Sequence, residues 1–528
     1  MPFLLRNITL KPGESEDLLP GMIISRFSLA PGEMKGFRVI RKAVDARKKT
    51  QIRIVYGIEF SLVDESGFWM LHQSDRDLDK VRVRETPRLP KIGTDRRIII
   101  VGAGPAGLFA AIRLAEYGLA PLILERGDEV EKRVKDIAKF WRYGVLDPES
   151  NVQFGEGGAG TFSDGKLTTR VRDDNCAFVL EKLVRFGAPE EILILAKPHI
   201  GTDRLRRVIV NIRSHLESSG TVFRFRAKIT DIVPNRGRLH SVIINERSEE
   251  PADLLLLAPG NSARDTYEML DRRGVALDQK PFAVGLRIEH PQELINRIQY
   301  GSSRHPHLPP ADYALTWNNE RTGRSAYSFC MCPGGFVVAA ASEEGGVVTN
   351  GMSDFLRDAP FANSALVVTV GKKDFPGEYP LAGVDFQRSL ERAAFTAGGG
   401  NYRAPAQNLI AFIGEKGRHG VHSSYLPGVV AADLSLILPG FVTDTLQEAI
   451  RSFDRRMRGF ITEEATLTGV ETRTSAPVRI VRGEDLQSPS MRGLYPVGEG
   501  AGYAGGIMSS ALDGIRAADA IAEKLMLR

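Results

Sequence analysis

Residues 97 to 107 read RIIIVGAGPAG, an apolar run followed at once by a glycine-rich turn. The run from Arg97 to Val101 predicts a buried parallel strand, and Leu108 to Tyr117 predicts a helix after the turn. In such a turn Gly102 makes the tight bend, Gly104 lets a pyrophosphate approach the backbone, and Gly107 lets the helix pack close to the strand. The stretch therefore predicts the first strand-helix unit of a dinucleotide-binding Rossmann fold.

A second apolar run strengthens this interpretation. Residues Ala120 to Leu124 predict the next strand, which ends in Glu125. A carboxylate at that place accepts hydrogen bonds from ribose hydroxyls, while the helix N-terminus directs unpaired N–H groups toward the phosphates. Because strand, turn, helix, strand and acid all occur at the required spacing, we interpret the motif as functional rather than structural.

Length and composition limit the class of protein. A chain of 528 residues predicts two or three domains, and its composition is that of a globular protein. No apolar stretch reaches the length of a membrane span, and the N-terminus lacks the layout of a signal peptide. Its three cysteines make no disulfide framework, so we expect a reducing, cytoplasmic location.

The net charge of +5 is concentrated near the N-terminus. Residues 1–95 hold 17 basic and 13 acidic side chains, and eight basic residues against two acids lie between Glu33 and Arg53. We expect a solvated helix face there, because charge runs are usually that. The alternative is weak contact with an anionic partner such as RNA, although aromatic residues do not interleave with the basic ones as stacking platforms would.

The N-terminal part of the chain has its own pattern. We expect residues 1–92 to form a small α+β domain of ferredoxin-like type. Strands are predicted at Phe3–Leu10 and Ile52–Val63, and a helix at Glu33–Lys48 with Phe37, Ile40, Ala43 and Val44 on one face. The prolines within Glu85–Lys91 indicate a linker to the next domain.

The rest of the chain is predicted to be an α/β nucleotide-binding domain with an insertion. Residues 93–265 and 490–528 form the Rossmann-like domain, and residues 266–489 form an inserted α+β substrate or cap domain. The remaining expected elements are a strand at Thr221–Ile232, its hairpin partner at Arg238–Asn245, strands at Leu254–Ala258 and Leu494–Val497, and a last helix from Ile507.

Three features favour FAD over NAD as the resident dinucleotide. Only one strand-turn-helix motif of this kind occurs, so a separate nicotinamide domain is not expected. The strand ending in Ala258-Pro259-Gly260 stands where many flavoproteins have an Ala-Thr-Gly turn. Gly498-Glu499-Gly500 precedes a helix whose N-terminus can stabilise the negative charge that collects on reduced flavin, by roughly 0.3–2 kcal/mol.

Four longer motifs resemble those of one family. They are the stretch from Asn151 to Leu167, which reads NVQFGEGGAGTFSDGKL, Tyr327 to Gly335, Glu471 to Arg479, and Gly498 to Ser509. The family is that of FAD-dependent proteins of bacteria and plastids known as uncharacterised NAD(FAD)-utilising dehydrogenases. The resemblance covers nearly the whole chain. It implies the flavoprotein fold with two dinucleotide-binding motifs, of the glutathione reductase type, with FAD bound and no settled substrate.

The resemblance also implies which residues meet FAD. Pro259 departs from the usual Thr, which removes a hydroxyl and a backbone donor near the cofactor. Carried over by position, the pyrophosphate, ribose, adenine and flavin contacts fall to Gly102, Gly104, Pro105, Ala106, Gly107, Glu125, Arg126, Gly157, Gly158, Thr161, Lys166, Leu167, Ile229, Pro259, Gly260, Gly498, Glu499, Gly506, Ile507 and Met508.

Candidates for chemistry come from charged and sulfur-containing side chains. Lys166 follows the second glycine cluster and either assists the flavin or pairs with Asp164. Cys330 and Cys332 are either an electron relay or small buried residues. Arg473, like Arg479, either clamps an anionic substrate or forms a structural ion pair with Glu471 or another acid. His305 and His307 are more typical of a loop, and no set of side chains has metal-ligand spacing.

These observations predict an FAD-dependent oxidoreductase. Hydride passes through flavin N5 between NAD(P)H or an unknown organic substrate and an acceptor, so the enzyme is a dehydrogenase or reductase, with a monooxygenase as a further option. NAD(P)H is a transient electron donor in this scheme. Two alternatives remain: an RNA-directed flavoenzyme that uses the basic N-terminal domain, and a non-catalytic FAD-binding redox scaffold.

Overall fold

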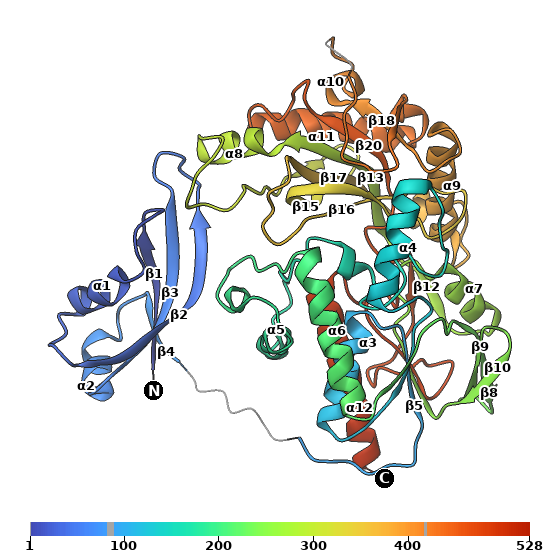
Figure 1. Cartoon of the computed structure of the whole chain (residues 1–528), viewed down its shortest axis with the longest axis horizontal. Coiled ribbons are helices and arrows are strands. Elements are labelled where there is room, and N and C mark those ends of the chain that lie inside the picture. The colour runs from blue at the N-terminus through green and yellow to red at the C-terminus, as the bar shows by residue number, and fades with distance from the viewer. Residues whose placement is uncertain (1, 82–88, 417–419, 528) are drawn as a thin grey trace.

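The computed structural model describes residues 2–81, 89–416 and 420–527, so part of the linker predicted at Glu85–Lys91 lies outside the described residues. Its mixed α/β architecture has a small N-terminal unit, a nucleotide-binding unit and a third unit built on a large sheet (Figure 1). This confirms the predicted fold class. Among the described residues, we find no helix with the length and apolar character needed to cross a membrane.

The N-terminal unit follows the order βαββαβ. Its elements are β1 Phe3–Leu10, α1 Leu18–Phe27, β2 Met34–Asp45, β3 Arg53–Leu62, α2 Glu65–His72 and β4 Leu78–Lys80. The antiparallel sheet has the order β2-β3-β1-β4, which together with the element order gives a ferredoxin-like arrangement. Alternate residues of β3, such as Ile58 and Phe60, pack under the two helices because side chains alternate between the faces of a strand.

The helix predicted at Glu33–Lys48 is wrong, because this segment is the edge strand β2. A register shift between Val39 and Arg41 explains the error: the pairing with β3 skips Ile40, which breaks the strict alternation of a strand, and the spacing of Phe37, Ile40 and Val44 imitates a helix. The basic residues are also partly neutralised, since Lys42 pairs with Glu16 at 2.6 Å and Arg38 with Glu59 at 2.9 Å. Lys42 also joins the strand to the nucleotide-binding unit through main-chain hydrogen bonds with Ile194 and Ala196.

The nucleotide-binding unit is built on a parallel sheet of order β22-β11-β5-β6-β7. Ile98 and Ile100 of β5 face one layer of helices, and Ile99 faces the other side of the sheet, where a small antiparallel sheet packs. The elements are β5 Ile98–Val101, α3 Pro105–Glu116, β6 Leu122–Leu124, α4 Val130–Tyr143, α5 Asn175–Arg185, α6 Thr202–Ser218, β7 Val222–Arg224, β8 Ile229–Asn235, β9 Arg238–Ile244, β10 Ser248–Pro251, β11 Leu254–Leu257, α7 Arg264–Arg272, β22 Leu494–Pro496 and α12 Ile507–Met526.

The single strand predicted at Thr221–Ile232 is also wrong. It divides into β7, which belongs to the parallel sheet, and β8, which pairs with β9 in the antiparallel sheet. Arg226 lies between them with φ of 53°, a left-handed conformation that ends one strand and redirects the chain. The hairpin partner at Arg238–Asn245 and the last helix from Ile507 are confirmed.

The third unit is a mixed sheet of order β14-β15-β17-β13-β20-β18-β19, with β16 paired to β15. Helices α8, α9 and α11 pack against it, and a two-stranded pair, β12 with β21, stands where the chain enters and leaves. The elements are β12 Leu277–Gln279, β13 Phe282–Pro291, α8 Gln292–Tyr300, β14 Thr316–Asn319, β15 Arg324–Ala339, β16 Thr349–Met352, β17 Phe361–Val370, α9 Ala382–Ala397, β18 Ala404–Asn408, α10 Leu409–Phe412, β19 Val429–Ala431, α11 Gly440–Arg456, β20 Thr466–Glu471 and β21 Val478–Ile480.

Candidate functional site

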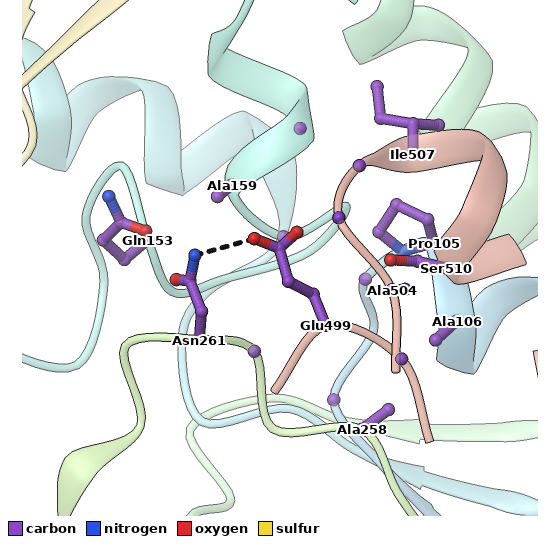
Figure 2. A pocket seen from close by; sticks show the side chains of 18 of the residues that line it. Pro105, Ala106, Gln153, Ala159, Ala258, Asn261, Glu499, Ala504, Ile507 and Ser510 are labelled. Atoms are coloured by element: carbon purple, nitrogen blue, oxygen red, sulfur yellow. Dashed lines mark hydrogen bonds between the residues drawn. The ribbon is translucent and has the colours of Figure 1, made fainter. Parts of the chain in front are cut away.

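One cavity of about 820 Å³ lies between the nucleotide-binding unit and the large mixed sheet. Its size falls within the range of roughly 300–1,000 Å³ found for cofactor and substrate pockets. Both glycine clusters and the turn before α12 line one part of it (Figure 2). Residues of β15, β16 and β20 line another part. Segments far apart in the sequence therefore meet around one space.

Two helix N-termini open into this cavity. The N-cap residues of α3 and α12 are Gly104 and Gly506, and neither helix has a side chain that caps it. The first N–H groups of both helices are thus available to an anionic or electronegative ligand. A Cβ atom at Gly102 would overlap the carbonyl oxygen of Ala258, which explains why glycine is required at this turn.

The carboxylate of Glu125 is fixed at the end of β6. It accepts hydrogen bonds from the backbone N–H groups of Ala103 at 2.8 Å, Gly127 at 2.9 Å and Gly155 at 2.9 Å. Since a carboxylate has about four acceptor positions, it keeps capacity for a ribose hydroxyl. The donor groups at the two helix ends and this acceptor suit the diphosphate and ribose of FAD.

Most of the predicted cofactor residues line the cavity. They are Gly102, Gly104, Pro105, Ala106, Glu125, Arg126, Gly158, Lys166, Ile229, Pro259, Gly260, Gly498, Glu499, Gly506 and Ile507. The side chain of Arg126 pairs with Glu149 at 2.8 Å and with Asp265 at 2.9 Å.

The other five predicted cofactor residues lie behind this lining. They are Gly107, Gly157, Thr161, Leu167 and Met508. Leu167 and Met508 are core residues with 2% and 3% of their surface exposed. A Cβ at Gly107 would overlap the carbonyl oxygen of Gly102, so this glycine serves the packing of α3 against the turn.

Comparison with known proteins identifies the family. A model described as "FAD-dependent protein, C-terminal domain-like" matches residues 281–474, an NAD(P)-binding Rossmann-like domain matches residues 100–138, and a domain of unknown function matches residues 4–61. An uncharacterized protein of Clostridium beijerinckii is 46% identical over 534 residues, covering 100% of both chains. The chain belongs to this family of FAD-dependent proteins.

Solved structures similar to this FAD-dependent protein include the flavin-dependent brominase Bmp2, at 13% identity and a TM-score of 0.37, covering 82% of this chain and 80% of the other. A geranylgeranyl bacteriochlorophyll reductase-like protein from Thermoplasma acidophilum has 12% identity and a TM-score of 0.34, covering 82% and 79%. The glycerol-3-phosphate dehydrogenase from Bacillus halodurans complexed with FAD has 12% identity and a TM-score of 0.34, covering 82% and 65%.

The four predicted catalytic residues of the FAD-dependent protein, Lys166, Cys330, Cys332 and Arg473, all line the cavity. Arg473 is held in an ion pair with Glu391 at 2.9 Å and donates a hydrogen bond to Ser342 at 2.5 Å. Because Glu391 also binds Arg264 at 2.7 Å, Arg473 belongs to a larger buried ion cluster.

The two thiols lie where the register of β15 breaks. Cys330 has φ of 43° and its side chain is exposed to the cavity, whereas Cys332 is buried. The enclosing cavity removes water from around the thiol of Cys330 and raises its pKa to about 12, and burial raises the pKa of Cys332, although nearby Lys166 opposes both shifts. Both groups are therefore neutral thiols near neutral pH.

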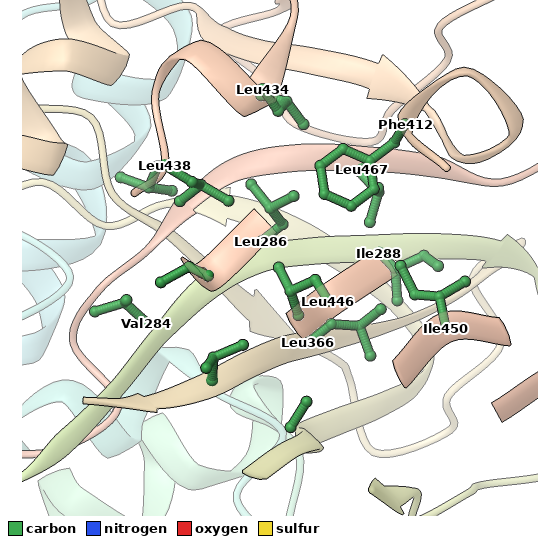
Figure 3. Close-up of a cluster of buried hydrophobic side chains, with 14 of the residues drawn as sticks. Val284, Leu286, Ile288, Leu366, Phe412, Leu434, Leu438, Leu446, Ile450 and Leu467 are labelled. Carbon is green, nitrogen blue, oxygen red and sulfur yellow. The ribbon is translucent and has the colours of Figure 1, made fainter. Parts of the chain in front are cut away.

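Beneath these thiols lies the fully buried guanidinium of Arg287. It donates hydrogen bonds to Glu471 at 3.1 Å, Asn363 at 2.9 Å and the carbonyl oxygen of Cys330 at 2.7 Å. Arg287 reaches this place because Leu286 and Ile288 point to the other face of β13, into the core against α11 (Figure 3).

Sequence reasoning missed Asn261 and Lys280, which both line the cavity. Asn261 donates a hydrogen bond to Glu499 at 2.9 Å (Figure 2), and Lys280 is close enough to favour the charged form of Glu499. Asn261 directly follows the Pro259-Gly260 turn, and this position beside a predicted cofactor-binding turn could have identified it as a site residue. Lys280 stands between β12 and β13 outside any motif, so nothing in the sequence pointed to it.

We expect Glu499→Gln to remove a pH dependence of folding. Burial raises the pKa of Glu499 to about 7. Between pH 5 and 7 the folded protein holds a proton that the unfolded chain has lost, so stability falls as pH rises through this window. Because the carboxylate is partly exposed to the cavity, we discount the effect to about 2 kcal/mol.

The measurement is urea unfolding of cofactor-free protein at pH 5 and pH 8, with Glu320→Gln, an exposed residue, as the control. The wild type and the control variant should lose more stability between these pH values than Glu499→Gln does. Equal pH dependence in all three proteins would refute the prediction.

Proposed function

We propose that this protein is an FAD-dependent oxidoreductase that passes reducing equivalents between NAD(P)H or an organic substrate and an acceptor. The observation that carries this proposal is the single cavity shared by the dinucleotide-binding turns and by polar residues of the mixed sheet. When bound, FAD supplies hydride exchange at its N5 position.

The roles of the residues follow from their places. The N–H groups at the start of α3 hold the diphosphate, and Glu125 binds a ribose hydroxyl. The start of α12, which has no side-chain cap, would stabilise negative charge on the ring system of a bound flavin. Lys166 adds a positive charge nearby, while Arg473 is a positioning residue because its guanidinium binds Glu391.

The proposal includes a division into three domains. Residues 1–92 form the small ferredoxin-like domain, residues 93–265 and 490–528 bind FAD, and residues 266–489 form the inserted domain that covers the cofactor. Separate clusters of buried apolar residues in the N-terminal sheet and in the mixed sheet support this division. We place the protein in the cytoplasm on the basis of its free cysteines.

An absorbance spectrum of the purified protein, followed by anaerobic titration with NADH and NADPH, tests the proposal. We expect the spectrum of bound flavin at about one per chain and its bleaching by one of the two nucleotides or, after photoreduction, rapid reoxidation by an acceptor. A colourless protein that takes up no FAD would refute the proposal. Bound flavin that is neither reduced nor reoxidised would identify the non-catalytic scaffold instead.

A further inference from the structure

We propose that the end of the cavity formed by Lys166, Arg170, Phe329 and Cys330 binds a small organic anion, a carboxylate or phosphate carried on a planar apolar body. This inference rests on the proposed function, because it names the class of substrate that the oxidoreductase would take. All four residues line the same cavity as the dinucleotide-binding turns.

The charges around this end are unbalanced. Asp164 is the nearest carboxylate to Lys166, at 3.8 Å, but Asp164 already pairs with Arg357 at 2.5 Å and accepts a hydrogen bond from Ser353. Arg170 has no hydrogen bond or ion pair with any described residue. Lys166 therefore shares one carboxylate with Arg357, and Arg170 has none among the described residues, which leaves a net positive charge at this end of the cavity.

The other charged groups near this end are already neutralised. Glu471 pairs with Arg287 at 3.1 Å, and Arg473 pairs with Glu391 at 2.9 Å. His199, whose backbone bridges that of Lys166, is neutral because burial lowers its pKa. The net charge offered to a ligand here is positive, and it is carried by Lys166 and Arg170.

Lys166 is not placed to serve the FAD diphosphate. That group belongs at the start of α3, whereas Lys166 acts on the thiols of Cys330 and Cys332, on β15 of the mixed sheet. An ammonium and a guanidinium on one segment bind carboxylate or phosphate oxygens by charge-assisted hydrogen bonds.

Residues of β15 give this part of the cavity lining an apolar surface. The ring of Phe329 lies 6.4 Å from that of Tyr327 and packs beside Ala283, Ala365 and Val367. Cys330 and Cys332 add neutral thiols to the same surface. A planar apolar body would stack on this surface, with its anionic group directed to Lys166 and Arg170.

Isothermal titration calorimetry of the purified full-length protein tests the inference. The probes are benzoate and phenyl phosphate, with benzyl alcohol as the neutral analogue, at constant ionic strength. We expect one or both anions to bind at least tenfold more tightly than benzyl alcohol, and the tighter of the two to identify the anionic group.

Variants locate the binding. Lys166→Met and Arg170→Met should each weaken anion binding about tenfold or more, whereas Lys166→Arg and Arg170→Lys should retain most of it. Arg172→Met is the matched control, because Arg172 is exposed, lies two residues away and is not part of the cavity lining. Circular dichroism of each variant identifies any that fails to fold. If a methionine variant fails to fold, the anion affinity of the charge-retaining variant at that position is compared with the wild type instead.

Equal affinity for benzoate, phenyl phosphate and benzyl alcohol, no anion binding at millimolar concentrations, or unchanged affinity in both methionine variants would overturn the inference. Calorimetry needs no flavin signal, so it decides the inference even if the purified protein proves to lack FAD. A protein with reducible flavin but no charge-dependent binding would refute the inference alone and leave the proposed function standing.

Discussion

Replacing Glu125 with alanine is expected to give a protein that purifies without flavin and is less stable by roughly 3–9 kcal/mol. The carboxylate accepts hydrogen bonds from three backbone N–H groups, those of Ala103, Gly127 and Gly155. Each buried donor that loses its partner costs about 1–3 kcal/mol. The same change removes the acceptor for the ribose, so cofactor affinity and stability fall together.

Two further variants separate these effects. Glu125→Gln keeps one oxygen acceptor and should lie between the wild type and the alanine variant in stability. Glu320→Ala, at an exposed position with no described partner, should match the wild type. Flavin content is measured from absorbance and stability from urea unfolding. If Glu125→Ala retained flavin at one per chain, the ribose-binding role of Glu125 would be wrong.

The nucleotide-binding turn could be predicted from sequence because its determinants are local. The strand, turn and helix around Gly102 occupy about 20 consecutive residues. The glycine at position 107 is required by a carbonyl oxygen of the same stretch, that of Gly102. The last helix was predictable for the same reason, since its apolar face repeats at helical spacing over α12.

The helix prediction for segment 34–45 failed because the strand that this segment forms is irregular. A regular edge strand would have shown strict alternation, but the register shift between Val39 and Arg41 breaks that alternation at Ile40. The resulting spacing of Phe37, Ile40 and Val44 matches a helix. Only the pairing with β3, which is a nonlocal contact, selects the strand.

The ion pairs on the mixed-sheet side of the cavity could not be predicted for a related reason. The partner of Arg473 is Glu391, which lies 82 positions earlier in the sequence, and the partner of Arg287 is Glu471. Sequence alone offered Glu471 as a partner for Arg473 because the two are close in the chain. The topology of the mixed sheet determines these pairs, and no local pattern encodes them.

Arg287→Met is expected to destabilise the protein by about 3–5 kcal/mol, or to prevent folding, because it leaves the buried carboxylate of Glu471 without its positive partner. Burial raises the pKa of Glu471, but the guanidinium of Arg287 opposes this shift, and Glu471 in turn raises the pKa of Arg287, so each partner stabilises the charge of the other. The carbonyl oxygen of Cys330 and the amide oxygen of Asn363 would also lose donors. Urea unfolding at neutral pH measures the loss.

A double variant distinguishes an unpaired charge from lost packing. If the unpaired charge dominates, Arg287→Met combined with Glu471→Leu should recover about 2 kcal/mol or more relative to Arg287→Met alone, because no buried ion remains. Glu471→Leu alone should also be destabilising, because it leaves the buried guanidinium of Arg287 without a carboxylate partner. If the stability losses of the two single variants simply add in the double variant, Arg287 and Glu471 are not energetically coupled. The stability of this region then depends on packing around β13 instead.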